Sequence, residues 1–435
     1  LGQRSSHCVY HREPGKACIG SCCQVKTNQA FRYELDPNNV QHGALVQHAG
    51  VARFAYNWAL ADRIERFEQN EGKAKFTSAI EQHKLLNSLK VAQFSWMYSV
   101  SKCAPQEALR DCERAYRNFW RGRKQGQDIG FPTFKKKGQH DSFRLTGSLH
   151  VKEHGVVLPR IGRIRTKEGT EKFRGRILSA TVSREADRWF CSLAVEVERA
   201  KPLAVVGEAV GIDLGIKTFA VLSNGERFES PKLLKRKMKK FQLLSRQVSR
   251  KKKGSKNRTK ANLHVARLNR SIRNIRKDFL HKLSTSVAKS HGIVCIEDLA
   301  ERNMVRNHHL AQSISDAGWG EFRRMLAYKC SWYGSELRVI GRFAASSKTC
   351  SVCGEVNYSL ALADRTWVCE NCGTLHDRDD NASVNILNLG TGSHRPEPHP
   401  SKIGCNACGD PLTKRWSQKQ EASSPVFLHE VVCNE

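Results

Sequence analysis

Cys350-Ser-Val-Cys353 is followed, after fifteen intervening residues, by Cys369-Glu-Asn-Cys372 and then by His376-Asp-Arg-Asp379-Asp-Asn381. Two Cys-x-x-Cys pairs at this separation can hold one zinc ion, because each two-residue gap bends the chain enough to place both sulfurs on the same ion. The four cysteines therefore predict the structural site of a zinc ribbon, with free thiols as the alternative. The acids directly after the second pair indicate that the ribbon is inserted into a catalytic domain.

Two acids further upstream lie in otherwise apolar segments. Asp213 is the single acid of residues 210–223, a run typical of a strand, a glycine-containing turn and a second strand. Glu297 ends the short apolar strand predicted for residues 293–297. Burying an isolated carboxylate is costly unless it is paired or binds a cation. Acids of this kind that converge in the fold would form a site for a hard divalent ion, which takes oxygen ligands.

The order of these elements resembles the ribonuclease H fold, and RuvC-type nucleases in particular. Four motifs then make the chain similar to the TnpB (OrfB) family of insertion sequences, and four motifs in one order are more specific than any single pattern. The motifs are Gly211-Ile-Asp-Leu-Gly-Ile-Lys217, Ile296-Glu-Asp-Leu299, Ser346-Ser-Lys-Thr-Cys-Ser-Val-Cys-Gly354 and Cys372-Gly-Thr-Leu-His-Asp-Arg-Asp-Asp-Asn-Ala382. Members of this family are transposon-encoded RNA-guided DNA endonucleases, related in their nuclease half to type V CRISPR effectors.

The resemblance implies roles for three acids. Asp213 would bridge two catalytic ions, Glu297 would hold one of them, and Asp379 would complete the site. The family's catalytic aspartate precedes the motif asparagine by two residues, which selects Asp379 before Asn381 and leaves Asp377 a structural role. Magnesium is the expected ion, because it prefers carboxylates together with substrate phosphate. Two such ions cleave a phosphodiester by activating water and holding the leaving oxygen.

The expected fold class is a multidomain α/β and α+β chain: a ribonuclease H-like (RuvC) nuclease with an inserted zinc ribbon, a helical recognition lobe and a wedge-type β-barrel. We expect residues 1–25 to be a disordered extension outside the family, and residues 391–435, which contain Cys405-Asn-Ala-Cys408, to be a disordered tail. The boundaries expected between them are 26–36 and 126–202 for the barrel, 37–125 for the lobe, 203–343 and 376–390 for the nuclease, and 344–375 for the ribbon.

The charge of the chain predicts a polyanionic partner. Its 435 residues contain 73 Lys and Arg against 42 Asp and Glu, a net charge of +31. Residues 230–277 contain no acid and nineteen Lys or Arg, which indicates a basic helical hairpin over residues 231–290. Its second helix is expected to pack an apolar stripe, including Ile275, on the nuclease sheet, with Arg267, Arg270 and Arg273 off that stripe. A solvated face without a ligand is the alternative.

The resemblance implies a guide RNA from the transposon end and target double-stranded DNA as partners. No apolar run of eighteen residues occurs, so no membrane span is expected. Scattered cysteines and the lack of a signal pattern in residues 1–26 favour the cytoplasm of a prokaryote. Two other functions remain open: a transposase or resolvase that acts on transposon ends without a guide, and a guided repressor that has lost nuclease activity. Relatives of the second kind would be expected to lose one or more of the three acids, all of which are present.

Overall fold

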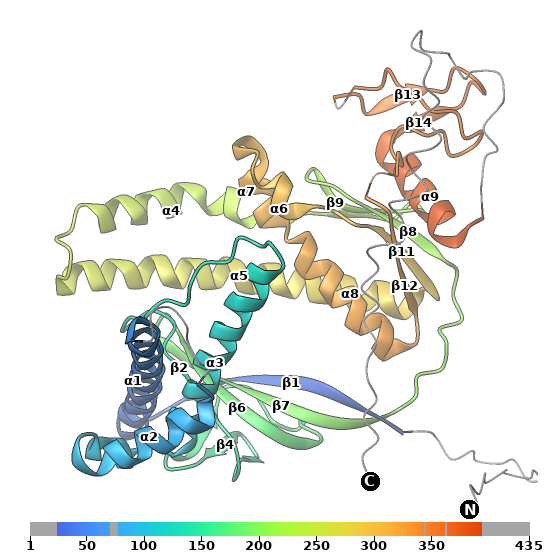
Figure 1. Ribbon diagram of the computed structural model, residues 1–435. Coiled ribbons are helices and arrows are strands. Elements are labelled where there is room, and N and C mark those ends of the chain that lie inside the picture. The colour runs from blue at the N-terminus through green and yellow to red at the C-terminus, as the bar shows by residue number, and fades with distance from the viewer. Residues whose placement is uncertain (1–23, 70–76, 343, 362, 394–435) are drawn as a thin grey trace, which may run out of the picture.

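The computed structural model describes residues 24–69, 77–342, 344–361 and 363–393. They form two larger sheets, each with its own helices, and a small two-stranded sheet near the C-terminal end (Figure 1). Most of the segments 1–25 and 391–435, for which we expect disorder, lies outside the described residues. Residues 24 and 25 belong to a strand and Thr391 ends a helix, so the ordered chain extends slightly beyond the expected boundaries.

The first sheet has seven antiparallel strands in the order β2-β6-β7-β1-β5-β4-β3. The N-terminal strand β1 occupies the middle, where it pairs with β7 from Gln24 opposite Ala200 to Leu35 opposite Trp189. Inward-facing apolar residues alternate with outward-facing polar ones along the strands, as expected for a sheet with one buried face. The strands are β1 (Gln24–Asp36), β2 (Ser142–Leu145), β3 (His150–Lys152), β4 (Gly155–Leu158), β5 (Gly162–Thr166), β6 (Arg176–Glu185) and β7 (Arg188–Ala200).

A helical bundle covers this sheet and shares its core. Leu60 of α1, Leu109 of α3 and Trp189 of β7 are almost fully buried in one cluster. A capping box, in which Ser78 and Glu81 satisfy each other's backbone N–H groups, begins α2. Two aromatic residues of the bundle differ in their surroundings: Tyr56 is buried, whereas Trp120 is 41% exposed. The helices are α1 (Asn39–Gln69), α2 (Ala79–Ala92), the 3₁₀ helix η1 (Ser95–Ser99) and α3 (Cys103–Lys124).

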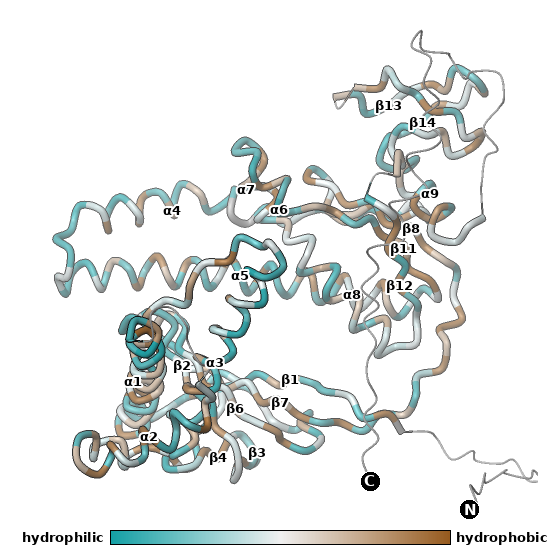
Figure 2. The backbone as a smooth tube through the Cα atoms, viewed as in Figure 1, coloured by the Kyte–Doolittle hydropathy of each residue, from teal (hydrophilic) through white to brown (hydrophobic). Residues whose placement is uncertain are grey.

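The second sheet has the strand order β10-β9-β8-β11-β12. Its strands β8, β9 and β10 are antiparallel, and β11 runs parallel to both β8 and β12. The hairpin expected to carry Asp213 and the strand expected to end in Glu297 are therefore confirmed. Brown, apolar segments concentrate in these strands (Figure 2). The bounds are β8 (Val210–Leu214), β9 (Thr218–Leu222), β10 (Arg227–Glu229), β11 (Ile293–Glu297) and β12 (Glu336–Ile340).

Helices cover both faces of the second sheet. Ile212 and Ile296 point to one face, where they pack against α8 (Trp319–Tyr333) and the C-terminal half of α5 (Lys256–Ser290). The alternate residues point to the other face, where Cys295 packs against Ile386 of α9 (Arg378–Thr391). Two short helices, α6 (Glu301–Met304) and α7 (His308–Ala317), connect β11 to α8. Because side chains alternate along a strand, Asp213 and Glu297 belong to the α9 face.

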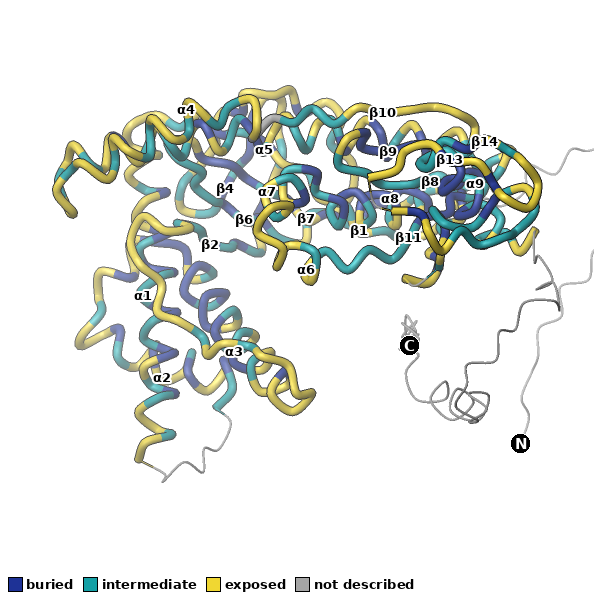
Figure 3. The backbone as a smooth tube through the Cα atoms, turned by 90° about the horizontal axis from the view of Figure 1, so that it is seen from above, coloured by how far each residue is buried: buried dark blue, intermediate teal, exposed yellow. Residues whose placement is uncertain are grey.

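The expected basic hairpin consists of α4 (Leu233–Ser249) and α5, and its outer end projects away from the sheet (Figure 3). Only the C-terminal half of α5 packs on the sheet. Further out, Leu268 and Ile272 pack instead against Phe241 and Leu244 of α4. The expected stripe was wrong at Ile275, which is 41% exposed. Ile275 lies between the part of α5 that packs on α4 and the part that packs on the sheet.

Candidate functional site

Asp213 and Glu297 lie side by side at the ends of two parallel strands. The register pairs Ile296 of β11 with Ile212 of β8, so the following residues, Glu297 and Asp213, emerge at the same edge of the sheet. Both carboxylates face α9. The strand pairing thus brings together two acids that are 84 positions apart in the sequence.

Helix α9 carries the third predicted acid and lies directly on the sheet. A Cβ built at Gly211 would lie only 2.1 Å from the carbonyl oxygen of Ser383, and one built at Gly390 only 2.3 Å from the sulfur of Cys295. Glycine on each side therefore allows the helix and the strands to approach closely. Asp377 begins α9 as its N-cap, accepting hydrogen bonds from the backbone N–H groups of Asp379 and Asp380. Asp377 thus has the structural role expected for it.

The three carboxylates interact electrostatically. Burial, together with the charges of Glu297 and Asp379, raises the pKa of Asp213 to about 7, although the nearby charge of Arg378 opposes the increase. Burial also raises the pKa of Glu297, against a hydrogen bond from Ser346 that favours the carboxylate. Because the charges of Glu297 and Asp379 destabilise the Asp213 carboxylate, these acids have the chemistry of a cation site, where a divalent ion would offset the repulsion.

Two arginines form ion pairs with acids near Asp213. Arg365 Nη1, which comes from the cysteine-rich segment, lies 3.3 Å from Asp379 Oδ1. Arg227 of β10 lies 2.6 Å from Asp380 and 3.2 Å from Asp377. Asp380 is therefore paired with β10, and its charge is not among those that raise the pKa of Asp213. Its neighbour Asp379 is the acid of α9 whose charge acts on Asp213.

Asp298, the residue after Glu297, forms ion pairs with two arginines, Arg323 and Arg342. Its carboxylate accepts hydrogen bonds from Arg323 of α8 and, at 2.7 Å, from Arg342. Burial alone would raise the pKa of Asp298, but the two guanidinium groups lower it. Asp298 is thus a paired anion that anchors the end of β11 and is not a fourth member of the carboxylate cluster.

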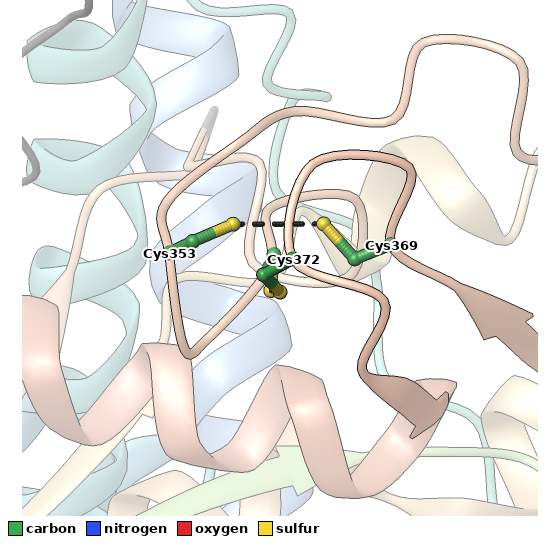
Figure 4. Close-up of side chains that lie close together, drawn as sticks. Cys353, Cys369 and Cys372 are labelled. Atoms are coloured by element: carbon green, nitrogen blue, oxygen red, sulfur yellow. Dashed lines mark hydrogen bonds between the residues drawn. The ribbon is translucent and has the colours of Figure 1, made fainter.

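The four predicted cysteines come together in the cysteine-rich segment. Their sulfur atoms all lie within 4.8 Å of one another, and the close pairs are Cys353 with Cys369 at 3.5 Å and Cys350 with Cys372 at 3.6 Å (Figure 4). Four sulfurs arranged tetrahedrally at about 2.3 Å from zinc would be roughly 3.8 Å apart. The thiol geometry therefore fits a zinc ion. Among the described residues, this is the one group of three or more such ligands gathered so tightly.

Two equivalent turns present these cysteines. In the first, Gly354 N–H donates to Cys350 O at 2.9 Å, and in the second, Gly373 N–H donates to Cys369 O at 2.8 Å. Both glycines have a positive φ, 79° and 70°, which a side chain would disfavour. Strand β13 (Thr366–Val368) leads into the second turn, and its partner β14 (Leu375–Asp377) leads from that turn to α9. The four-cysteine cluster and Asp379 are thus connected through one short strand, β14.

The three arginines off the apolar stripe of α5 contact the first sheet. Arg267 and Arg270 hydrogen-bond to Asp187 at 2.9 and 3.0 Å, and Arg273 pairs with Glu185. We call these contacts to the β6–β7 turn the hairpin latch. Partial burial alone would raise the pKa of Asp187, but hydrogen bonds from Arg267 and Arg270 lower it to about 2. The three arginines are therefore paired with acids of the same protein. Their position off the apolar stripe did not predict these ion pairs.

The other basic residues of the hairpin, along α4 and around the tip between α4 and α5, have different surroundings. In the described part of the chain, the Lys and Arg residues from 235 to 260 form no ion pair with an acid. Lys252, Lys253 and Lys256 are exposed. The positive charge of the hairpin is therefore divided between a neutralised part at the latch and an uncompensated part that runs along α4 and includes the tip.

Comparison with known proteins places the chain in a family. A protein of Streptomyces pristinaespiralis named "Putative RNA-guided DNA endonuclease" is 37% identical over 93% of this chain and 96% of its own length. The chain belongs to the TnpB (OrfB) family. The Escherichia coli (strain K12) protein named "Putative RNA-guided DNA endonuclease InsQ" is 33% identical over 84% of this chain and 93% of its own length. The resemblance stated from the four motifs is confirmed.

Three family descriptions match parts of this TnpB chain: "Probable transposase" at residues 192–308, "Cas12f1-like, TNB domain" at 319–386 and "Helix-turn-helix domain" at 27–73. A solved Cas12f1–sgRNA–target DNA complex aligns with 84% of this chain and 99% of its own, at 16% identity and a TM-score of 0.49. No helix among the described residues is long and apolar enough to cross a membrane.

The structure brings the four predicted cysteines together and places Asp213 beside Glu297, with Asp379 near enough for its charge to act on Asp213, while the roles of all these residues remain predictions. Sequence reasoning missed Arg365, Ser346 and Arg227, which contact the three central acids or their neighbours. Ser346 and Arg365 lie within or beside the recognised motifs, so a search for polar residues flanking each motif would have found them. Arg227 carried no signal, because its contact with α9 joins residues 153 positions apart.

Proposed function

We propose that this TnpB protein is an RNA-guided DNA endonuclease whose nuclease centre consists of Asp213, Glu297 and Asp379. The observation that carries the proposal is that the paired strands β8 and β11 place Asp213 beside Glu297, with Asp379 of α9 near enough for its charge to add to burial in raising the pKa of Asp213. The strand order, with three antiparallel strands followed by two parallel ones, supports a ribonuclease H-like, RuvC-type domain. The names of the two bacterial relatives support guided cleavage of DNA.

The residues fit two kinds of metal. Asp213, Glu297 and Asp379 would hold magnesium, and Cys350, Cys353, Cys369 and Cys372 would hold a structural zinc ion. Bound magnesium supplies Lewis acidity that activates water and stabilises the leaving oxygen. The protein itself fixes the three carboxylates through two parallel strands and a closely packed helix. Arg365 adds a positive charge 3.3 Å from Asp379, where the scissile phosphate of a bound strand would have to approach.

The tip of the hairpin is the proposed contact for the nucleic acid backbone. Its uncompensated lysines and arginines are available for phosphates, whereas the latch arginines are already paired with acids. The guide RNA and the target DNA are both polyanions, so the charge alone does not distinguish them. By resemblance, the guide comes from the transposon end, the helical bundle is the recognition lobe and the first sheet corresponds to the wedge-type barrel. A cytoplasmic location is part of the same proposal.

Purification with its guide and a cleavage assay test this function. The protein, expressed together with its flanking transposon DNA, should retain an RNA with a defined 3′ end. In magnesium it should then cut a plasmid library with randomised bases beside the target, and Asp213→Ala and Glu297→Ala should abolish the cuts. Cleavage that persists in both variants would refute the catalytic assignment. Cleavage that needs no RNA would favour a guide-independent transposase or resolvase, and guided binding without cleavage would favour a repressor.

A further inference from the structure

The loop that leads into the zinc ribbon contacts the candidate metal site directly. Ser346 is 6% exposed, and its hydroxyl donates a hydrogen bond to Oε1 of Glu297. The two residues are 49 positions apart in the sequence. The terminal torsion of a glutamate side chain is broad and is poorly fixed by its own rotamer preference. A buried hydroxyl that donates to one carboxylate oxygen therefore determines how this carboxylate is presented.

The same loop is fastened to α9 by two asparagines. Asn385 Nδ2 donates to the carbonyl oxygens of Ser346 at 2.7 Å and Thr349 at 2.6 Å. Asn381 Nδ2 also donates to Thr349 O at 2.7 Å, and Asn381 Oδ1 accepts from the N–H of Ser351 at 2.9 Å. Both asparagines are more than nine-tenths buried. Because these buried groups satisfy one another, the loop has one favoured position on the helix.

This network of hydrogen bonds connects three parts of the molecule: the first cysteine turn, helix α9 and strand β11. Thr349 and Ser351 flank Cys350, so the asparagines hold the first zinc turn. The same helix carries Asp379, four positions before Ser383 and close to the N-cap. Ser346 then connects the network to Glu297 of β11. The zinc cluster, the helix with the third acid and the strand with the second acid are therefore mechanically coupled through one six-residue loop.

We propose that Ser346 is a positioning residue for Glu297, and that the folded zinc ribbon supports divalent-ion binding at the nuclease centre through it. The inference rests on the proposed function, because it takes Glu297 to be a ligand of the catalytic ion. Partners that orient a metal ligand typically change metal affinity by about 10- to 100-fold when removed. The ribbon would thus act on the reaction without contributing an atom to it.

Binding of Mn²⁺ to the full chain without RNA, measured by calorimetry, tests the role of Ser346. Ser346→Ala should weaken binding at least about tenfold, and Ser346→Thr, which keeps the hydroxyl, should restore it. A pocket of about 150 Å³ bordered by Ser346, Ala345 and Asn385 has space for the added methyl group. Ser347→Ala, one position along the same loop, is the matched control and should bind as the wild type does.

The outcomes separate this inference from the proposed function. If Asp213→Ala leaves Mn²⁺ binding unchanged, the proposed metal site is wrong. If Asp213→Ala abolishes binding but Ser346→Ala behaves like Ser347→Ala, only the role of Ser346 is overturned. Failure of Ser346→Thr to restore affinity would also overturn it, since a hydroxyl at this position would then not be the relevant group.

A double-mutant cycle tests the coupling to the zinc ribbon. Cys353→Ser/Cys372→Ser, which removes two zinc ligands, should lower Mn²⁺ affinity, and adding Ser346→Ala should lower it little further. Such non-additivity is expected when two changes break one pathway. Fully additive losses, or normal Mn²⁺ affinity in the zinc-free variant, would overturn the coupling.

Discussion

Gly211 of β8 and Ser383 of α9 are in direct contact, with no space between them for a side chain. The nearest atom to a Cβ at position 211 would be the carbonyl oxygen of Ser383, a backbone atom that cannot rotate away. This contact sets the distance between the strand that carries Asp213 and the helix that carries Asp379. The geometry of the carboxylate cluster therefore depends on a glycine that has no chemical role.

Gly211→Ala should separate α9 from the sheet. Overpacking of this kind costs about 1–3 kcal/mol of stability, and a displaced Asp379 should lower cleavage further than the loss of folded protein explains. Urea unfolding and a cleavage rate measured on the same preparation check this. Gly341→Ala is the control, because a Cβ there meets nothing within 4 Å. Equal behaviour of the two variants would contradict the role given to Gly211.

Asp379→Asn and Asp380→Asn should differ strongly in cleavage. Loss of a carboxylate that holds the catalytic ion removes several kcal/mol of transition-state stabilisation, which corresponds to at least about a hundredfold in rate. Asp380 pairs with Arg227 and should be worth less than about tenfold. The measurement is the single-turnover cleavage rate of RNA-bound protein at saturating magnesium. A greater loss in Asp380→Asn would reassign the third acid.

Asp187→Asn should destabilise the hairpin latch in a pH-dependent manner. The folded pKa of about 2 lies below the ordinary value of 3.8, so the ion pairs stabilise the protein above pH 4 and their contribution is lost as the pH falls towards 2. At pH 7 the expected loss is about 1–2 kcal/mol after allowance for solvent screening. Thermal unfolding from pH 7 to pH 3 should show the difference from wild type narrowing below pH 4.

Asp278→Asn is the control for the latch, because it removes an exposed ion pair with Lys282 from the same helix. Exposed pairs of this kind contribute about 0–1 kcal/mol. An Asp187→Asn effect no larger than that of Asp278→Asn, or one independent of pH, would mean that the latch does not hold the hairpin to the first sheet.

Removal of zinc should unfold the ribbon locally. Cys369→Ser replaces a thiol that is 1% exposed and should reduce bound zinc from about one per chain to none, since a tetrahedral structural site needs all four ligands. Metal analysis measures the loss, and proteolysis should then cut within residues 344–375. Cys330→Ser, a buried cysteine of α8, should keep its zinc. Retention of zinc by Cys369→Ser would refute the four-cysteine site.

Removing the lysines at the hairpin tip should weaken binding to nucleic acid, and the loss should increase with the number of phosphates that these lysines contact. Lys252→Ala/Lys253→Ala/Lys256→Ala should make the dependence of log Kd on log salt shallower by about 1 for each phosphate that is no longer bound. Fluorescence anisotropy at several salt concentrations gives the slope. Three exposed lysines in and between the strands of the first sheet, Lys152, Lys167 and Lys172, provide a control with the same change in net charge. An equal change in both triple variants would mean that only the net charge matters.

The sequence predicted local features of the site well, because each depended on a short pattern. The apolar run around Asp213, the strand ending in Glu297 and the spacing of the cysteines all specify their elements without reference to distant residues. Arg267, Arg270 and Arg273 were harder, since their partners lie 80 to 88 positions away, in a turn with no distinguishing pattern. Ile275 illustrates the same limit: its periodicity was correct, but the helix changes partner beside it.

The central position of β1 has a consequence for synthesis of the protein. Gln24–Asp36 leaves the ribosome before every other described strand and helix, yet its long partner β7 ends at Ala200, about 160 residues later. At a translation rate of about 5–20 residues per second, β1 must wait roughly 10–30 s with its strand edges unpaired. Helices α1 to α3 emerge during that interval and can cover its apolar face. Expression conditions that slow translation between Asp36 and Ala200 should therefore increase aggregation of the nascent chain.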